Sequence, residues 1–424
     1  MLKRYWKLYT LIVVIILIVG IFYLKPIFSN TDYPNFTIKT IEGNPSEVEE
    51  LTLQGYYSPD SRIQNEFGMI HSDKYFSLIK NKTLYDKQTS FLSQSTYIEK
   101  TSPLASLQNE HKKFFRGKSS LTQNFFEDDS FLVYIELNQE YLDRNSGKRF
   151  FSISMLNKKT DEQLAYKIDF PKTKDYQFVD IQKIQIINSN LTVLTRNDIP
   201  QTDPEEYHEN SQEYHIYQLD LGNQKVTSDN QISFESNASA NEVTYIELIS
   251  ETKINQTSDD LIFSLSYEQP FDEENEMVPL DSNSRVPSYE LYHYKISTKE
   301  TKKILLPKEY NKVDSTIVLD RSKIYSYHYT GNRINLYTTN LMNLDESSKK
   351  VITLPVSNDA IEWQNIKNNK LYLVSKTKHS PLKKQLLIYH LTEEEMIYEG
   401  SFEPTSDILQ NNKNSVTIDY GLID

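Results

Sequence analysis

The sequence contains no cysteine and only ten glycines in 424 residues. Without cysteine there are no disulfide bonds, no thiolate nucleophile, no thiolate zinc site and no lipid-modified cysteine of a bacterial lipoprotein. The two closest glycines, Gly43 and Gly55, are twelve positions apart. This spacing excludes the glycine-rich dinucleotide loop, the P-loop and the GxSxG nucleophile elbow. The HExxH pattern of zinc proteases is absent as well.

Basic residues are also scarce. There are 46 lysines and arginines against 59 aspartates and glutamates, which gives a formal net charge of −13 at pH 7. Such a field repels nucleic acid, so we expect no nucleic-acid partner. The exception is the basic segment 111–120, in which Phe114 and Phe115 could contact an anionic wall polymer or a lipid headgroup surface. The alternative for this segment is a solvated loop.

The longest uncharged apolar run covers residues 8–24 and follows the basic residues Lys3, Arg4 and Lys7. Its length lies at the short end of what a helix needs to cross a bilayer. Because basic residues stay on the cytoplasmic side, the pattern predicts a single-pass protein with its N-terminus in the cytoplasm. The alternatives are a cleaved signal peptide, although no small-x-small motif follows Gly20, and a buried helix of a soluble protein.

From this run we predict four regions. They are a cytoplasmic basic stub (1–7), a transmembrane anchor (8–24), a linker (25–48) and an extracytoplasmic domain (49–424). The expected location is therefore the cell membrane, with the bulk of the chain outside the cytoplasm. A large outer domain without cysteine and rich in lysine, asparagine and isoleucine favours a Gram-positive bacterium.

A hairpin pattern recurs along the chain. Each copy has an aliphatic residue, a tyrosine, a short alternating stretch, a polar turn and a second apolar stretch. Alternation with a period of two on both sides of a turn predicts a β-hairpin. The clearest copies begin at Ile216, Leu291, Leu336 and Ile388, and Arg149–Ile168 has the same shape with phenylalanine in place of tyrosine.

A second apolar stretch precedes each hairpin and is introduced by polar turn residues. Its copies begin about 45 to 70 residues apart, which is the scale of a four-stranded propeller blade. We therefore predict an all-β fold, a β-propeller of six or seven four-stranded blades preceded by one transmembrane helix. The copies are Tyr75–Leu78, Phe131–Tyr134, Leu191–Leu194, Leu261–Ser264, Ile324–Tyr327 and Leu371–Val374.

A propeller needs its first and last blades to meet. We predict that Glu50–Tyr57 closes the ring by pairing with the last blade or with Ser415–Leu422. Period-two runs also occur in other β folds, so a pair of β-sandwiches and a mixed α+β fold are the alternatives.

By repeat shape, from about residue 70 to 400, the chain resembles divergent membrane-anchored bacterial β-propeller-like proteins. The Trp-Asp dipeptide, the Gly-Gly pair and the Ser-x-Asp-x-Gly box of familiar blades are missing. The resemblance therefore implies a fold and assigns no functional residue.

Two acidic segments, Asp203–Asn210 and Phe271–Met277, fall between the two apolar elements of their repeats. We expect them to project from one rim of the ring, where repeat proteins often keep their binding surface. Clustered carboxylates could hold a structural Ca²⁺ ion, and a histidine among them could serve a softer metal. The alternative is a solvated acidic surface. The metal candidates are Glu205, Glu206, His208 and Glu209, and the binding candidates are Asp272, Glu273, Glu274, His293 and His390.

These observations assign no catalytic residue and predict no cofactor. We expect a membrane-anchored extracytoplasmic binding or regulatory module that recognises a protein or a cell-envelope component through its rim loops. The alternative is an envelope hydrolase or lyase that acts on glycan with carboxylates and histidines at the mouth of the channel.

Overall fold

The computed structural model describes most of the chain after residue 32. The described residues are 33–58, 64–65, 68–69, 74–85, 103–138, 149–171, 176–187, 190–199, 212–235, 243–249, 254–268, 289–310, 315–378, 380–405 and 414–423.

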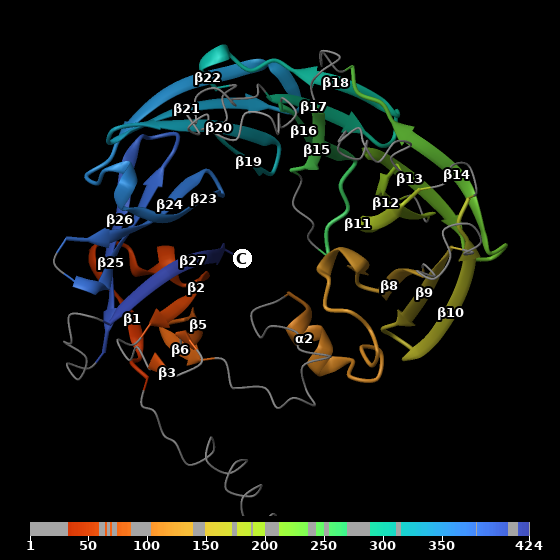
Figure 1. The fold of residues 1–424 in the computed structure, drawn as a ribbon, viewed down its shortest axis with the longest axis horizontal. Coiled ribbons are helices and arrows are strands. Elements are labelled where there is room, and N and C mark those ends of the chain that lie inside the picture. Colours follow the sequence, from red (N-terminus) through yellow and green to blue (C-terminus); the bar gives the residue numbers. More distant parts are fainter. Residues whose placement is uncertain are drawn as a thin grey trace, which may run out of the picture.

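Within this part of the chain, six antiparallel sheets of four or five strands stand around a central axis, as in a β-propeller (Figure 1). We number the sheets along the ring. Sheet 2 comprises β7 (Phe125–Glu127), β8 (Phe131–Asn138), β9 (Phe150–Asn157) and β10 (Glu162–Asp169). Sheet 3 comprises β11 (Phe178–Ile187), β12 (Asn190–Asp198), β13 (Gln212–Asp220) and β14 (Lys225–Ile232). Sheet 4 comprises β15 (Val243–Leu248), β16 (Asp260–Glu268), β17 (Tyr289–Lys295) and β18 (Glu300–Ile304).

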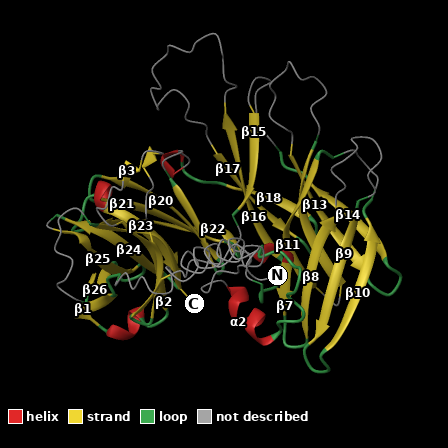
Figure 2. Ribbon diagram, turned by 60° about the horizontal axis from the view of Figure 1, so that its bottom comes forward, coloured by secondary structure: helices red, strands yellow, loops and turns green. Residues whose placement is uncertain are grey.

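The remaining sheets continue around the axis to sheet 1, as Figure 2 shows from another side. Sheet 5 comprises β19 (Thr316–Asp320), β20 (Lys323–Thr330), β21 (Arg333–Asn340) and β22 (Asn343–Thr353). Sheet 6 comprises β23 (Ile361–Lys367), β24 (Lys370–Thr377), β25 (Ser380–His390), β26 (Glu395–Pro404) and β1 (Phe36–Gly43). Sheet 1 comprises β27 (Ser415–Ile423), β2 (Leu51–Ser58), β5 (Lys74–Ile79) and β6 (Lys82–Tyr85). The smaller elements are β3 (Gln64–Asn65), β4 (Gly68–Met69), α2 (Pro103–Glu110), η1 (Pro45–Val48), η3 (Thr122–Asn124), η5 (Lys308–Tyr310) and η6 (Asn358–Ala360).

Both ends of the described chain take part in closing the ring. The C-terminal strand β27 pairs with β2, from Leu51 opposite Ile423 to Ser58 opposite Ser415. The N-terminal strand β1 pairs with β26 and becomes the fifth strand of sheet 6. The predicted pairing of Glu50–Tyr57 with Ser415–Leu422 is therefore confirmed.

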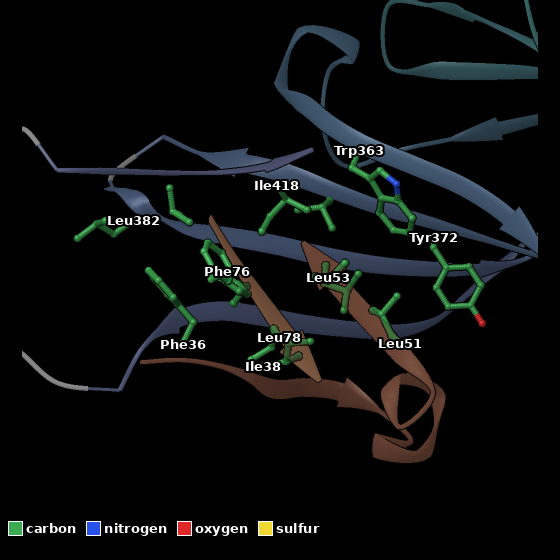
Figure 3. Close-up of a cluster of buried hydrophobic side chains, with 14 of the residues drawn as sticks. Phe36, Ile38, Leu51, Leu53, Phe76, Leu78, Trp363, Tyr372, Leu382 and Ile418 are labelled. Carbon is green, nitrogen blue, oxygen red and sulfur yellow. The ribbon is translucent and has the colours of Figure 1, made fainter. Parts of the chain in front are cut away.

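The seam between sheets 1 and 6 holds the apolar cluster drawn in Figure 3. Phe36 of β1 stacks on Phe402 of β26 with ring centroids 4.8 Å apart, and Phe76 of β5 stacks on Phe36 at 5.2 Å. A side chain at Gly421 of β27 would meet the Trp363 ring at 2.4 Å, so any larger residue there would displace the ring. The two terminal strands thus share one continuous core.

A buried ion pair fastens β27 at the same seam. Lys384 and Glu362 are 4% and 5% exposed, and the Lys384 Nζ donates to Glu362 Oε1 at 2.7 Å. The other carboxylate oxygen of Glu362 accepts from the backbone N–H of Ile418 on β27 at 3.3 Å. One carboxylate therefore joins three strands of two sheets.

The two ends of the strands differ in their connections. In sheets 2 to 5, and in sheet 6 apart from β1, neighbouring strands follow the order of the chain. First-to-second and third-to-fourth connections therefore leave one end of the strands, here called the turn edge. Second-to-third connections leave the other end, the loop edge. Short turns at the turn edge need left-handed backbone. Every described non-glycine residue with positive φ lies in such a turn: Lys80, Asn81, Asp161, Gln224, Lys299, Arg321, Asn368, Asn369 and Glu394.

Two parts of the sequence-based description need correction. The predicted linker (25–48) is too long, because Phe36–Gly43 forms β1 and η1 docks on sheet 6 through an ion pair between Glu47 and Lys370. The apolar stretch at Tyr75 is the third strand of its sheet, whereas the other five copies are second strands. The shift arises because the first strand of sheet 1 comes from the C-terminus.

Helix α2 packs on sheet 2 through Leu104 and Leu107. Phe114 and Phe115, expected as surface contacts of the basic segment, are buried in the same cluster. Ile254, from the connection between β15 and β16, also reaches this cluster, and its carbonyl accepts from the Glu127 N–H at 2.7 Å. Sheet 2 is therefore covered by a helix and a crossing segment.

The predicted transmembrane segment 8–24 lies outside the described residues. Among the residues that the structure does describe, no helix combines the length and the apolar character needed to span a bilayer.

Candidate functional site

The candidate site lies on sheet 3 next to the loop edge, where β12 ends and β13 begins. Strand pairing places Thr195 opposite His215 and Asn197 opposite Glu213. A bulge at Gln218 and Leu219 then places Asp229 of β14 opposite Tyr217. Because directly opposed residues share a face, these polar side chains converge on the face that packs against sheet 2.

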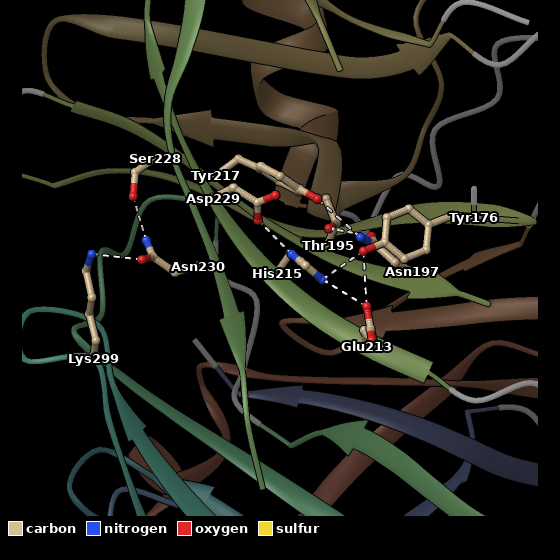
Figure 4. A network of polar contacts seen from close by, with 10 residues as sticks. All are labelled: Tyr176, Thr195, Asn197, Glu213, His215, Tyr217, Ser228, Asp229, Asn230 and Lys299. Atoms are coloured by element: carbon tan, nitrogen blue, oxygen red, sulfur yellow. Dashed lines mark hydrogen bonds and ion pairs between the residues drawn. The ribbon is translucent and has the colours of Figure 1, made fainter. Parts of the chain in front are cut away.

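His215 is the centre of this group, drawn in Figure 4, and it is only 4% exposed. Its Nδ1 lies 2.7 Å from Asp229 Oδ1. Its Nε2 lies 3.1 Å from the Tyr176 hydroxyl and 3.2 Å from Glu213 Oε2. Both ring nitrogens are thus occupied by partners from the same sheet or from the chain that leads into it.

A second layer of hydrogen bonds supports the histidine. Thr195 Oγ1 donates to Asn197 Oδ1 at 2.7 Å, and Asn197 Nδ2 donates to the Tyr217 hydroxyl at 3.2 Å. The Tyr217 ring lies almost parallel to the His215 ring, with centroids 5.7 Å apart. Buried polar groups that satisfy one another in this way hold a fixed geometry.

The tyrosines of this group are held protonated. Burial is the main cause that raises the pKa of Tyr176 to about 12, with Asn197 opposing the shift and nearby Glu213 adding to it. Burial also raises the pKa of Tyr217. At neutral pH the Tyr176 hydroxyl therefore carries its proton and donates to Glu213 Oε2 at 3.0 Å.

The opposite face of the same strand ends carries a second charged group. Arg196 Nη2 donates to Asp180 Oδ2 at 2.8 Å, and its Nε lies 3.8 Å from Asp198 Oδ1. Burial raises the pKa of Asp198, although Arg196 opposes the shift. The loop edge of sheet 3 is therefore charged on both faces.

The geometry of His215 suits a residue that holds strands in place better than one that reacts with a substrate. A carboxylate on Nδ1 fixes the orientation of an imidazole, as in catalytic relays. Here, however, Nε2 faces a buried tyrosine and a carboxylate instead of an open space. The network ties the segment before β11 to β13 and β14, and it fixes the two strand ends that flank residues 199–211.

The residues predicted from sequence are distributed as follows. Glu205, Glu206, His208, Glu209, Asp272, Glu273 and Glu274 lie outside the described residues. The strand ends that flank both acidic segments are the ends of second strands and the starts of third strands, so both segments connect at the loop edge.

The two predicted binding histidines do not meet each other. His293 on β17 contacts Asp260 Oδ1 through Nε2 at 2.7 Å. His390 belongs to β25 of another sheet, and its Nδ1 accepts from the Glu393 N–H at 3.4 Å. Both lie near the turn edge, away from the acidic connections. Among the described residues, no three histidine, aspartate or glutamate side chains are grouped to hold a metal ion.

The sequence patterns gave only a partial signal for the site itself. His215 stands in a tyrosine-rich strand, which marks it as a strand residue. Its partners Asp229 and Tyr176 come from β14 and from the segment before β11, and no spacing in the sequence relates them to it. The bulge on β14, where Thr227 is the extra residue, sets its register with β13, and period-two alternation does not predict bulges.

Comparison with known proteins adds likenesses of fold. No family model matches the chain, and no curated protein matches it. Among solved structures, the WD40 domain of SCAP from fission yeast is 11% identical, with 81% of this chain and 75% of that chain covered and a TM-score of 0.38. The β-propeller domain of the Trilobed protease from Pyrococcus furiosus is 10% identical, with 67% and 84% covered and a TM-score of 0.24.

Acylaminoacyl peptidase from Pyrococcus horikoshii is 12% identical, with 62% of this chain covered and a TM-score of 0.28, and the match spans 44% of that chain. At these identities and TM-scores, none of the three structures indicates a function for this chain. Its own sheet topology remains the basis for calling the ring propeller-like.

Proposed function

We propose that the chain is a non-enzymatic binding or regulatory module, held at the outer face of the cell membrane by residues 8–24. Its β domain acts as a six-bladed propeller and recognises a protein or a cell-envelope component through the loop edge of sheets 3 and 4. No cofactor is part of this proposal. A Ca²⁺ ion at Asp203–Asn210 stays a prediction.

The His215 network is the observation that supports this proposal most directly. Several buried polar groups of this network hold the strand ends that flank residues 199–211 in a fixed position. A connection with no role beyond joining two strands would not need such support. Connections carried on a rigid scaffold are where repeat proteins usually bind their partners. The second acidic connection, 269–288, leaves the same edge from the next sheet.

The charge of this edge indicates the chemistry of the partner. Asp180 is half exposed on the inner strand, and both connections carry clustered acidic residues in a chain of net charge −13. Complementary charge speeds association and selects partners. We therefore propose a partner with a cationic surface.

Crosslinking on intact cells tests the proposal. A reagent that does not cross the membrane would be applied to cells that carry the full-length chain, and the crosslinked species would be identified by mass spectrometry. A partner captured from outside, and lost when Glu205, Glu206 and Glu209 are changed to Gln, is the expected result. The matched control changes Glu300, Glu393 and Glu395 of the turn edge to Gln and should keep the partner.

Two outcomes contradict the proposal. If the impermeant reagent does not label the chain, the bulk of the protein is not outside. If the turn-edge control loses the partner as completely as the loop-edge variant, the acidic connections are not the recognition surface.

A second candidate function rests on one observation. Asp180 and Asp198 share Arg196 at the inner end of sheet 3, and the raised pKa of Asp198 is the environment of a general acid. An envelope glycan hydrolase or lyase would lose its activity in the Asp198→Asn variant. Glycan release that persists in this variant excludes the candidate.

A further inference from the structure

A pocket of about 280 Å³ lies beside α2, away from the loop edge of sheet 3. It is lined by Gln108, Asn109, Lys112, Phe115 and Arg116. These residues are spaced at i−4, i−3, i, i+3 and i+4 around Lys112, which is the spacing of one face of a helical path. The sequence therefore brings two cations, two carboxamides and one aromatic ring to a single surface.

The turn that follows α2 is anchored by backbone hydrogen bonds and by Phe115. The N–H of His111 donates to the Leu107 carbonyl at 2.8 Å, and the N–H of Phe115 donates to the His111 carbonyl at 3.3 Å. Phe115 stacks on Phe125 of β7, with centroids 5.1 Å apart and planes at 16°. Because Phe115 is fixed in the core, Lys112 and Arg116 on either side of it are presented from a fixed backbone.

The cations of the pocket are not neutralised by the protein. Within the described part of the chain, the side chains of Lys112 and Arg116 have no ion-pair or hydrogen-bond partner. Both are exposed, as is their neighbour Lys113. In a chain with a net charge of −13, acidic partners are abundant, so an unpaired lysine and arginine at one pocket form a local positive site.

We propose that this pocket binds the phosphoryl group of a small phosphate ester. The guanidinium of Arg116 presents a planar fork to two phosphate oxygens, and the Lys112 ammonium supplies a point charge for a third. The carboxamides of Gln108 and Asn109 add neutral donors, while Phe115 gives an apolar wall for the alcohol part. The volume lies near the lower end for ligand sites, which fits a small ester. Free metabolites and the phosphodiesters of headgroups or wall polymers share this chemistry.

Calorimetric titration of the full-length chain in a neutral detergent tests the site. The probes are inorganic phosphate, glycerol 1-phosphate as a monoester, glycerophosphoglycerol as a diester, and glycerol as the neutral control. We expect saturable binding of at least one ester, no binding of glycerol, and weaker binding at higher salt. A preference for the monoester points to a free metabolite, and a preference for the diester points to a headgroup or polymer.

Variants separate a built site from diffuse attraction. Lys112→Gln and Arg116→Gln should each weaken ester binding by about ten-fold or more, which is the loss expected for one charge-assisted contact. Lys113→Gln removes an equally exposed charge from the same turn but not from the pocket, and it should leave the affinity unchanged. All three side chains are exposed, so folding should not be affected.

Two results overturn the proposal. One is the absence of saturable binding by every phosphate probe. The other is a loss in Lys113→Gln as large as the loss in Arg116→Gln, because the site would then be a general basic surface. Neither result bears on partner capture by the loop edge, which uses other residues.

Discussion

The two faces of sheet 1 are packed in different ways. The face toward sheet 6 carries Leu53 and Phe76, which are almost completely buried in the cluster of Figure 3. The opposite face carries Tyr75, Leu84 and Tyr420, which are 59%, 41% and 49% exposed. Among the described residues, sheet 1 therefore meets a neighbouring sheet through a dense apolar core on one side only.

The next sheet along the ring shows where the difference comes from. Helix α2 lies on the side of sheet 2 that faces sheet 1 (Figure 1), and Phe114 and Phe115 are buried in the same cluster as α2 and sheet 2. A helix takes the place that sheet-on-sheet packing has elsewhere in the ring. The seam between sheets 1 and 6, where the terminal strands join, is therefore the apolar core that ties sheet 1 to the rest of the ring.

The largest expected effect comes from the Glu362→Gln variant. The change removes the charge that balances Lys384 at a buried position and weakens the hold on β27 through Ile418. Breaking a buried pair from one side typically costs about 3 to 5 kcal/mol, although the lowered pKa of the buried Lys384 amine limits the loss. Denaturation with urea would measure the free energy of unfolding.

A matched control for this change is Glu309→Gln, which removes the exposed partner of Lys349. It should leave the unfolding midpoint where it is, because exposed pairs are solvated before and after the change. Equal losses in the two variants would contradict the special role of the seam.

A pair of alanine variants compares the two faces of sheet 1 directly. Leu53→Ala empties a fully buried position and should cost about 2 to 5 kcal/mol of unfolding free energy. Tyr75→Ala removes a larger side chain from the exposed face and should cost less than about 1 kcal/mol. Thermal unfolding followed by circular dichroism would rank them. A larger loss in Tyr75→Ala would show that the exposed face is covered in solution.

Acid should loosen the N-terminal strand by a smaller amount. Lys383 on β25 and Lys39 on β1 bond to Glu403 of β26 and hold the pKa of its carboxyl below the ordinary value of 4.5. The folded pKa is the lower one, so the stabilisation is present above pH 4.5 and is lost as the pH falls through the folded pKa. Hydrogen exchange of β1, corrected for intrinsic rates, should speed up between pH 6 and pH 3.

The Glu403→Gln variant supplies the control for that measurement. Without a titrating carboxyl at this position, the corrected exchange of β1 should depend less on pH than in the parent chain. Identical pH profiles for the two proteins would assign the acid effect to other groups.

The sequence predicts most of the strands but not the elements β1 and α2 that pack beside the sheets. The apolar stretches at Leu191, Leu261 and Ile324 all became second strands, because alternation reports directly on a half-buried β conformation. The pairing of β2 with β27 was also predictable, since a ring must be closed by its ends. The strand β1 and the helix α2 were missed, because their short segments gain their structure from tertiary packing on sheets 6 and 2.

The candidate site was less accessible to sequence reasoning. His215 could be placed on a strand, whereas its contact with Asp229 depends on a bulge and its contact with Tyr176 on a connection between sheets. Such contacts are set by register and by the packing of one sheet on another, which composition and spacing do not encode. Lys112 and Arg116 were noticed as charges, but the burial of Phe115 between them became visible only in the fold.

A single crosslinking measurement tests the closure of the ring most directly. The chain has no cysteine, so cysteines placed at Thr52 and Leu422, which are direct partners across β2 and β27, can bond only with each other within one molecule. We predict rapid formation of an intramolecular disulfide on mild oxidation, detected by mass spectrometry, and none for the control with cysteines at Tyr75 and Leu422. Failure of the first pair to join, or bonds only between molecules, would contradict closure by the C-terminal strand.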